Sequence, residues 1–272
     1  MLFLLLYIYS KPFASELLIF FENYILSLLY FLRVLCYYFF MRIDKMFSEI
    51  GMFTRRETAD RIKRKLITVN GATVKKPDEK VNPEIDEIRV GGELVNYKKY
   101  AYILVNKPNG VVSATEDGRD KTVVDLLPPE MKKLNLFPCG RLDKDTVGLV
   151  ILTNDGISAH NNLSPKRHVE KKYYFETADE YFDDDLTAIE KGLTLADGYT
   201  TKPCKIERLS QNSGYITLTE GKYHEIKRLF GARRNKITYL KRVSFSSILL
   251  GNLKEGDWRY LTEEEEKIFT NN

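Results

Sequence analysis

The sequence has few of the residues that build metal centres or disulfide frameworks. Its 272 residues include three cysteines, Cys36, Cys139 and Cys204, and three histidines. No two cysteines show the short spacing typical of zinc or redox motifs, and the histidines form no ligand pattern with them. We therefore expect no bound metal and no disulfide framework, and we expect a reducing compartment, the cytoplasm, as the location.

Glycine-rich phosphate-binding loops are also missing. Neither the GxGxxG spacing nor a P-loop occurs, so a nucleotide cofactor is not supported and we expect no cofactor. A large excess of one sign of charge is absent as well, because 42 basic and 38 acidic residues leave a net charge of only +4. Nucleic-acid binding must therefore be inferred from where the basic side chains cluster.

Residues 1–40 differ in composition from the rest of the chain. Their apolar runs are interrupted by Lys11, Glu16, Glu22 and Arg33. A membrane helix needs about 20 consecutive apolar residues, and a charge at the bilayer centre costs about 2.5–3.5 kcal/mol. We therefore expect no membrane partner, and no clean signal peptide is present. Our hypothesis is that translation starts at Met41; the alternative is a membrane-associated or poorly packed helical extension.

Residues 41–98 show the pattern of a small domain. Apolar spacing predicts a helix from Ile43 that closes at Gly51, and a capping-box pattern predicts a second helix from Thr54 to about Lys65. Two short apolar stretches then flank Asn70-Gly71, which supplies the positive φ angles of a tight hairpin. With 43% hydrophobic residues, the chain can form this small domain and one medium domain.

The second predicted helix and its exit carry an excess of positive charge. Its basic residues outnumber Glu57 and Asp60 by four. These candidate RNA-binding residues are Arg55, Arg56, Arg61, Lys63, Arg64 and Lys65. A solvated helix face is the ordinary interpretation of such a run, and contact with RNA phosphates is the functional one.

Residues 100–265 predict a second, α+β domain. Strands are expected at 100–106, 172–177, 205–209 and 215–219, and helices at 184–192 and 223–230. This irregular order indicates a mixed, mostly antiparallel sheet and not a regular βαβ winding.

One carboxylate in this domain has a defined position. Val147–Leu152 is almost continuously apolar, which is typical of a strand buried on both faces, and a turn signal follows it. Asp143 therefore lies just before a core strand, between the basic residues Arg141 and Lys144. It is a candidate catalytic carboxylate, although a residue that only starts a turn fits the same spacing.

Several segments together resemble the RsuA-type rRNA pseudouridine synthases. The resemblance rests on residues 140–149 with 152–156, and on 106–110, 122–127, 170–173, 219–230 and 256–262. Residues 41–98 look like the S4 RNA-binding module that precedes the catalytic domain in this family. The resemblance extends from about Met41 to Glu265, and it implies a small S4-like helix-helix-hairpin module followed by a pseudouridine synthase domain.

The resemblance also implies a reaction and the residues that perform it. Uridine in RNA is isomerised to pseudouridine without a cofactor, with Asp143 acting either as a nucleophile on the ribose or as the base of an elimination. Lys227 is the implied ion-pair partner, since a nearby cation favours the ionised form of a carboxylate. Tyr173 is implied to stack on the target base, although a tyrosine in a strand is commonly core. Arg228 is implied as a phosphate or structural contact, and Arg141 as a further RNA contact.

Asp145 invites a different interpretation, a glycosidase with two carboxylates. Such pairs stand about 5–9.5 Å apart across one bond, and Asp143 and Asp145 are too close in sequence for that geometry. We expect Asp145 and Thr146 to hold the loop through local hydrogen bonds instead.

The Gly-Lys-Tyr-His-Glu-Ile-Lys-Arg form of residues 221–228 favours the small-subunit branch of the family. We therefore expect a monomeric synthase that acts on small-subunit (16S) ribosomal RNA, either free or in an assembly particle. Two alternatives remain: a large-subunit synthase of the same chemistry, and a non-catalytic RNA-binding assembly factor.

Overall fold

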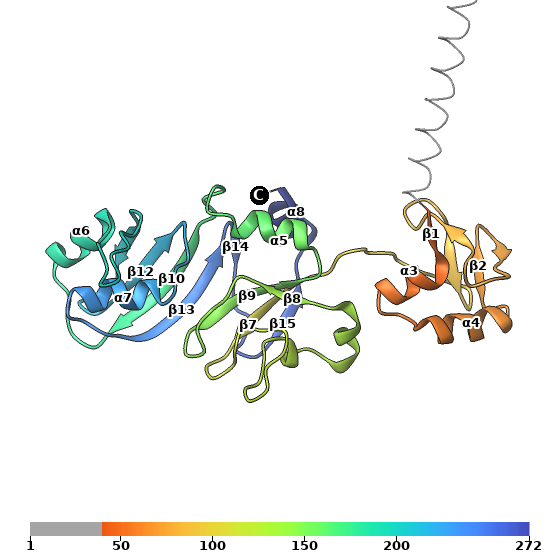
Figure 1. The fold of residues 1–272 in the computed structure, drawn as a ribbon, viewed down its shortest axis with the longest axis horizontal. Helices are drawn as coiled ribbons and strands as arrows, with labels where there is room; N and C mark the ends of the chain where they lie inside the picture. The colour runs from red at the N-terminus through yellow and green to blue at the C-terminus, as the bar shows by residue number, and fades with distance from the viewer. Residues whose placement is uncertain (1–39, 272) are drawn as a thin grey trace, which may run out of the picture. The chain divides into compact units, whose positions relative to one another are not determined.

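A computed structural model describes residues 40–271, and these fall into two compact units whose boundary lies between Tyr97 and Lys98 (Figure 1). The hypotheses about the N-terminal extension concern residues 1–39, which lie outside the described residues. Within the described part, no helix is both long enough and apolar enough to cross a membrane.

The first unit contains two helices and short strands. Helix α3 spans Ile43–Glu49 and α4 spans Arg55–Lys63. A four-stranded sheet has the order β3 (Ala72–Thr73), β2 (Ile67–Val69), β5 (Ile88–Val90) and β6 (Glu93–Leu94), while β1 (Met41–Arg42) pairs with β4 (Lys80–Val81).

The local signals in this unit form as predicted. The Thr54 side chain accepts a hydrogen bond from the Glu57 N–H, and the Glu57 carboxylate accepts one from the Thr54 N–H at 2.7 Å. Asn70 and Gly71 both have positive φ angles, of 50° and 80°, in the turn between β2 and β3. Apolar side chains of both helices and the sheet share one core.

The second unit is built on one mixed sheet. Its main strand order is β11 (Lys205–Arg208), β12 (Ser213–Leu218), β10 (Lys171–Thr177), β13 (Ile237–Phe245), β9 (Val147–Thr153), β7 (Tyr102–Lys107) and β15 (Trp258–Tyr260). Two short strands extend it, since β8 (Phe137–Cys139) pairs with β9 and β14 (Ile248–Leu249) pairs with β13. All of these pairs are antiparallel except β13 with β9, so the expectation of a mixed, mostly antiparallel sheet is confirmed.

Helices cover both faces of this sheet (Figure 1). Alternate residues of β7 and β9 enter two different apolar clusters, as the two-residue period of a strand requires. One cluster includes side chains of α6 (Asp183–Lys191) and α7 (Glu225–Ala232), and the other includes side chains of α5 (Gly156–Leu163) and α8 (Glu263–Asn271). Two 3-10 helices, Val124–Leu126 and Pro129–Leu134, lie between β7 and β8 in the chain.

Two elements differ from the expectations. Strand β13 has nine residues but was not predicted, because Lys241 and Arg242 interrupt its apolar pattern. Helix α7 begins at Glu225 and not at Tyr223, because His224 has a left-handed φ of 49° and acts as the N-cap.

The parallel contact between β9 and β13 requires a glycine. Gly148 pairs with Arg242 and has a φ of +103°. A Cβ atom at this position would lie against the carbonyl oxygen of Arg242 and 2.7 Å from its nitrogen. The start of β9, and with it the preceding loop that contains Asp143, is therefore fixed by close backbone packing.

Candidate active site

The loop that carries Asp143 is tied down by a buried lysine. Lys107, at the end of β7, is fully buried, and its ammonium group donates to the carbonyl oxygens of Pro108, Lys144 and Thr146 at 3.1, 3.1 and 2.7 Å. Burial lowers the pKa of Lys107 to about 8, against the opposing charges of Asp145 and Asp143. The loop is thus clamped directly after Asp143, which precedes the buried strand β9 as predicted.

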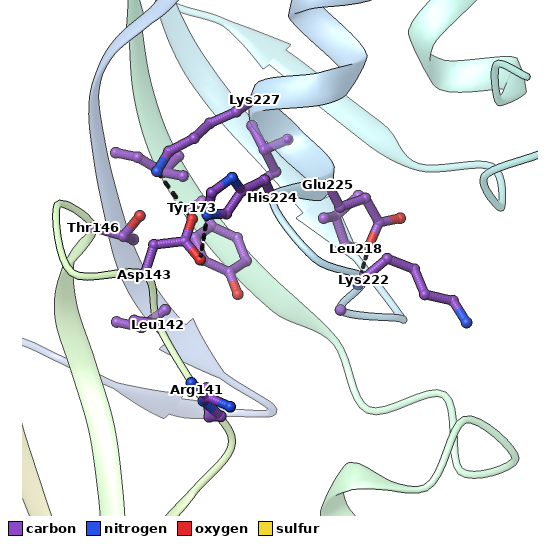
Figure 2. A pocket seen from close by; sticks show the side chains of 13 residues that line it. Arg141, Leu142, Asp143, Thr146, Tyr173, Leu218, Lys222, His224, Glu225 and Lys227 are labelled. Carbon is purple, nitrogen blue, oxygen red and sulfur yellow. Dashed lines mark hydrogen bonds and ion pairs between the residues drawn. The ribbon is translucent and has the colours of Figure 1, made fainter. Parts of the chain in front are cut away.

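Asp143 contacts two basic side chains of α7 (Figure 2). Its Oδ2 accepts a hydrogen bond from Lys227 Nζ at 2.9 Å, and its Oδ1 lies 3.5 Å from His224 Nε2. The Asp143 side chain is 27% exposed, so one part of the carboxylate remains accessible. The structure therefore brings Asp143 and Lys227 together, as the resemblance implied.

Lys227 also binds Asp145. Lys227 Nζ donates to Asp145 Oδ1 at 2.5 Å, in addition to a hydrogen bond between the Asp145 carboxylate and its own backbone. The expectation that the Thr146 side chain holds the loop is wrong, since its buried Oγ1 has no hydrogen-bond partner among the described residues. Burial acts to lower the pKa of Lys227, but its bonds to Asp145 and Asp143 outweigh that effect and raise it.

Helix α7 presents these basic side chains because its other face is anchored in the core. Ile226, Leu229 and Phe230 are buried in the same apolar cluster as Tyr173. Lys227 lies in the first turn of α7 and His224 is its N-cap, and both side chains reach Asp143. The His224 ring stacks on Tyr223 with centroids 3.8 Å apart.

Tyr173 lies in β10 and is 8% exposed, so most of its ring is part of the core. It nevertheless lines a small, open cavity of about 70 Å³ together with Asp143 (Figure 2). Other lining residues are Arg141, Leu142, Thr146, Leu218, Lys222, His224, Glu225 and Lys227. The cavity thus brings all three predicted catalytic residues to one place.

Two carboxyl groups lie beside this cavity. Glu225 and Glu220 are 4% and 7% exposed, and burial together with the neighbouring Glu220 raises the pKa of Glu225 to about 7. Glu225 accepts a hydrogen bond from the Lys222 N–H at 2.7 Å. Glu220 accepts from Tyr199 and from the Lys202 N–H. The pair therefore shapes the segment between β12 and α7.

The predicted RNA-binding residues have different surroundings. Arg141 is exposed and lines the cavity. Arg228 pairs with Asp197 at 2.6 Å, so it makes a structural contact. In the first unit, the exposed basic residues of α4 and its exit are Arg55, Arg56, Lys63, Arg64 and Lys65, of which Lys63 lies 3.8 Å from Asp60. Arg61 is half-buried, with its guanidinium 3.7 Å from the centre of the Phe53 ring.

Comparisons with known proteins agree with this geometry. The family model for RNA pseudouridylate synthase matches residues 101–232. The protein named uncharacterized RNA pseudouridine synthase YtzG, from Bacillus subtilis, is 44% identical over 230 residues, which is 83% of this chain and 96% of the relative. The chain belongs to the RNA pseudouridine synthase family. Ribosomal small subunit pseudouridine synthase A of Haemophilus influenzae is 36% identical over 228 residues, 83% of this chain and 97% of the relative.

A solved structure extends the comparison to the fold. The crystal structure of a pseudouridylate synthase superposes with a TM-score of 0.60 at 34% identity and covers 84% of this chain and 99% of that chain. The resemblance to the RsuA type is thereby confirmed, and the protein is an RNA pseudouridine synthase, an isomerase. Among residues 40–271, no group of three or more His, Cys, Asp and Glu side chains is arranged to hold a metal ion.

Sequence reasoning about this pseudouridine synthase missed His224, Lys107 and the Glu220–Glu225 pair. His224 had no usable signal in the sequence, because its contact with Asp143 depends on the left-handed backbone that starts α7. For Lys107 no signal was available, since a lysine in an apolar strand gives no sign of which carbonyl groups it will meet.

Proposed function

We propose that this synthase isomerises a uridine of small-subunit ribosomal RNA and that Asp143 is its catalytic carboxylate. The observation that carries the assignment is that Asp143, Tyr173 and Lys227 line one cavity, with Lys227 bonded to the carboxylate at 2.9 Å. The small-subunit target is supported by relatives named ribosomal small subunit pseudouridine synthase A.

The reaction makes few demands, and three of the residues around the cavity can meet several of them. The bond from uracil N1 to ribose C1′ breaks, the base turns over, the bond from C5 to C1′ forms, and the C5 proton leaves while N1 gains one. Asp143 acts at the ribose, as nucleophile or as base, and Lys227 holds its carboxylate through a charge-assisted hydrogen bond of 2.9 Å. Tyr173 offers part of its ring to the extruded base, and a base stacked on an aromatic ring gains about 1–3 kcal/mol.

The target uridine must leave its stack to reach this cavity, which costs a few kcal/mol. Contacts with RNA phosphates have to supply that free energy. We propose that residues 41–98 are an S4-like RNA-binding domain and residues 100–265 the catalytic domain. The domain of residues 41–98 would contact RNA phosphates through the exposed basic residues of α4. Its two helices, its hairpin and its local excess of positive charge support this role.

We propose that the enzyme acts as a monomer and that it lies in the cytoplasm with its RNA.

The test is to map pseudouridines in ribosomal RNA from cells with and without this protein. We expect one position in small-subunit RNA to revert to uridine when the protein is absent, and to be modified again when it is restored. Loss of a position in large-subunit RNA would identify the large-subunit alternative. An unchanged map would contradict the proposed substrate.

A further inference from the structure

A second cavity lies next to the one that holds Asp143. It has a volume of about 270 Å³ and shares Arg141, Tyr173, Gly221 and Lys222 with the first. Its lining includes five cations and one carboxylate. The cations are Arg141, Lys171, Lys202, Lys222 and Arg242, and the carboxylate is Glu220.

Two of these cations are buried without a counter-ion. Lys171 is 7% exposed and Arg242 is 1% exposed, and neither forms an ion pair with a carboxylate within residues 40–271. Lys171 Nζ donates to the Val169 carbonyl at 2.9 Å, and Arg242 Nε donates to the Leu149 carbonyl at 2.7 Å. Arg242 Nη2 is buried with no hydrogen-bond partner among the described residues.

This arrangement is electrostatically costly. Burial, and after it the charge of Arg242, lower the pKa of Lys171 to about 8, against weaker opposing effects of Cys139 and Glu225. Buried charges in proteins are normally paired. Glu220, which lines the same cavity, is already engaged by Tyr199 and by the Lys202 N–H. The cavity therefore offers two cations to an anion that comes from outside.

The position of the two cations indicates where that anion comes from. Arg242 is the cross-strand neighbour of Tyr173, and Lys171 precedes Tyr173 by two residues in β10. Both are carried by strands in the interior of the sheet, so their positions are fixed. Arg141 and Lys222 line both cavities and are exposed to solvent, and Figure 2 shows them at the first cavity. An anion bound here would lie directly beside the nucleoside at Tyr173.

We propose that Lys171 and Arg242 form a buried binding site for one backbone phosphate of the RNA, adjacent to the target nucleotide, with Arg141 and Lys222 at its entrance. Guanidinium and ammonium groups that are already desolvated bind phosphate oxygens through charge-assisted hydrogen bonds. The inference rests on the proposed function, because it takes the occupant of the first cavity to be a nucleotide of RNA.

The central experiment compares Lys171→Met with Lys191→Met. Both variants lose one positive charge, but Lys191 is exposed at the end of α6 and lines neither cavity. The RNA is a synthetic fragment around the uridine that the wild-type enzyme modifies, with single neutral methylphosphonate linkages placed one at a time beside it. One linkage should weaken binding to wild type and to Lys191→Met on the order of tenfold or more.

The Lys171→Met variant should lose most of its sensitivity to that linkage, and the slope of log Kd against log salt should fall by about 1 relative to wild type. Equal sensitivity in wild type and Lys171→Met would overturn the proposal.

Thermal unfolding separates this role from a structural one. Because Lys171 is a buried cation without a counter-ion, free Lys171→Met should melt no lower than wild type. A lower melting temperature with unchanged linkage sensitivity would show that Lys171 only supports the fold, and would overturn the proposal.

Inorganic phosphate distinguishes failure of this site from failure of the proposed function. If the wild-type enzyme modifies no small-subunit uridine, the proposed function fails. Phosphate should nevertheless raise the melting temperature of wild type more than chloride does at equal ionic strength. It should not raise the melting temperature of Lys171→Met in this way. Stabilisation by phosphate without any effect of a neutral linkage in RNA would mean that the site takes free phosphate, and would contradict the assignment to the RNA backbone.

Discussion

Replacing Lys227 by methionine tests how much the cation contributes to the proposed chemistry. The substitution keeps the length of the side chain and removes the charge that lies 2.9 Å from Asp143. At an effective dielectric constant of about 20, two unit charges at this distance attract by roughly 6 kcal/mol. The net loss is smaller because the side chains are 22% and 27% exposed. Truncating one partner of such a pair costs about 2–5 kcal/mol.

We therefore expect the single-turnover rate of Lys227→Met to fall by about 10²–10³, because each 1.36 kcal/mol is about tenfold in rate. Binding of RNA should change far less. Two features increase the loss of rate in Lys227→Met. Asp145 remains near Asp143 without its cation, and the clamped loop fixes the positions of both carboxylates.

The assay is tritium release from C5 of labelled uridine in RNA, with enzyme in excess. Arg233→Met is the matched control, since it removes a cation at the other end of the same helix, where Arg233 pairs with Asp185 at 2.7 Å. Lys227→Arg should recover part of the activity. A Lys227→Met rate within about threefold of wild type would refute the reasoning, because that corresponds to less than about 1 kcal/mol.

Three further predictions concern other parts of the protein. Gly148→Ala should lower the free energy of unfolding by about 3–5 kcal/mol, because a Cβ meets the backbone of Arg242 at a φ of +103°; an unchanged urea midpoint would contradict this close approach. Glu225 has a folded pKa of about 7, raised from 4.5, so its contribution to stability is fully present below pH 4.5 and is lost as the pH rises through 7. This amounts to at most about 3 kcal/mol, since the lowered pKa of Glu220 acts in the opposite direction. In urea unfolding between pH 4.5 and 7, Glu225→Gln should flatten the pH dependence, and a profile like that of wild type would show that Glu225 is not the titrating group. Joint replacement of Arg55 and Arg56 by alanine should weaken RNA binding and reduce the salt slope by about 2 without changing the single-turnover rate at saturating enzyme; unchanged affinity would remove α4 from the RNA-binding surface.

Much of the fold could be predicted because its local signals agree with the tertiary structure. The capping box at Thr54, the Asn70-Gly71 turn and the apolar run of β9 each specify one local conformation, and each forms. The strand expected at 172–177 likewise forms, as part of β10.

The rest could not be predicted because buried charges break the apolar patterns on which such predictions depend. Arg242 lies inside β13 and Lys171 at the start of β10, and both are almost fully buried. A sequence pattern interprets such residues as exposed, since it contains no information about the carbonyl groups and cavities that they meet. The same limitation explains why Lys107 was not recognised as the clamp of the Asp143 loop.

The site itself was predicted in part. The resemblance identified Asp143, Tyr173 and Lys227, and the structure places them around one cavity. His224 was missed because its contact with Asp143 depends on the left-handed backbone that starts α7.

The central claim is that Asp143 is the group that acts on the ribose, and Asp143→Asn tests it most directly. Asparagine has nearly the same shape and keeps a hydrogen-bonding oxygen for Lys227, but it cannot act as nucleophile or base. Pseudouridine formation and RNA affinity should be measured on the same preparation. The account predicts no detectable conversion, with a Kd for RNA within a few fold of wild type; conversion at a rate near that of wild type would contradict it.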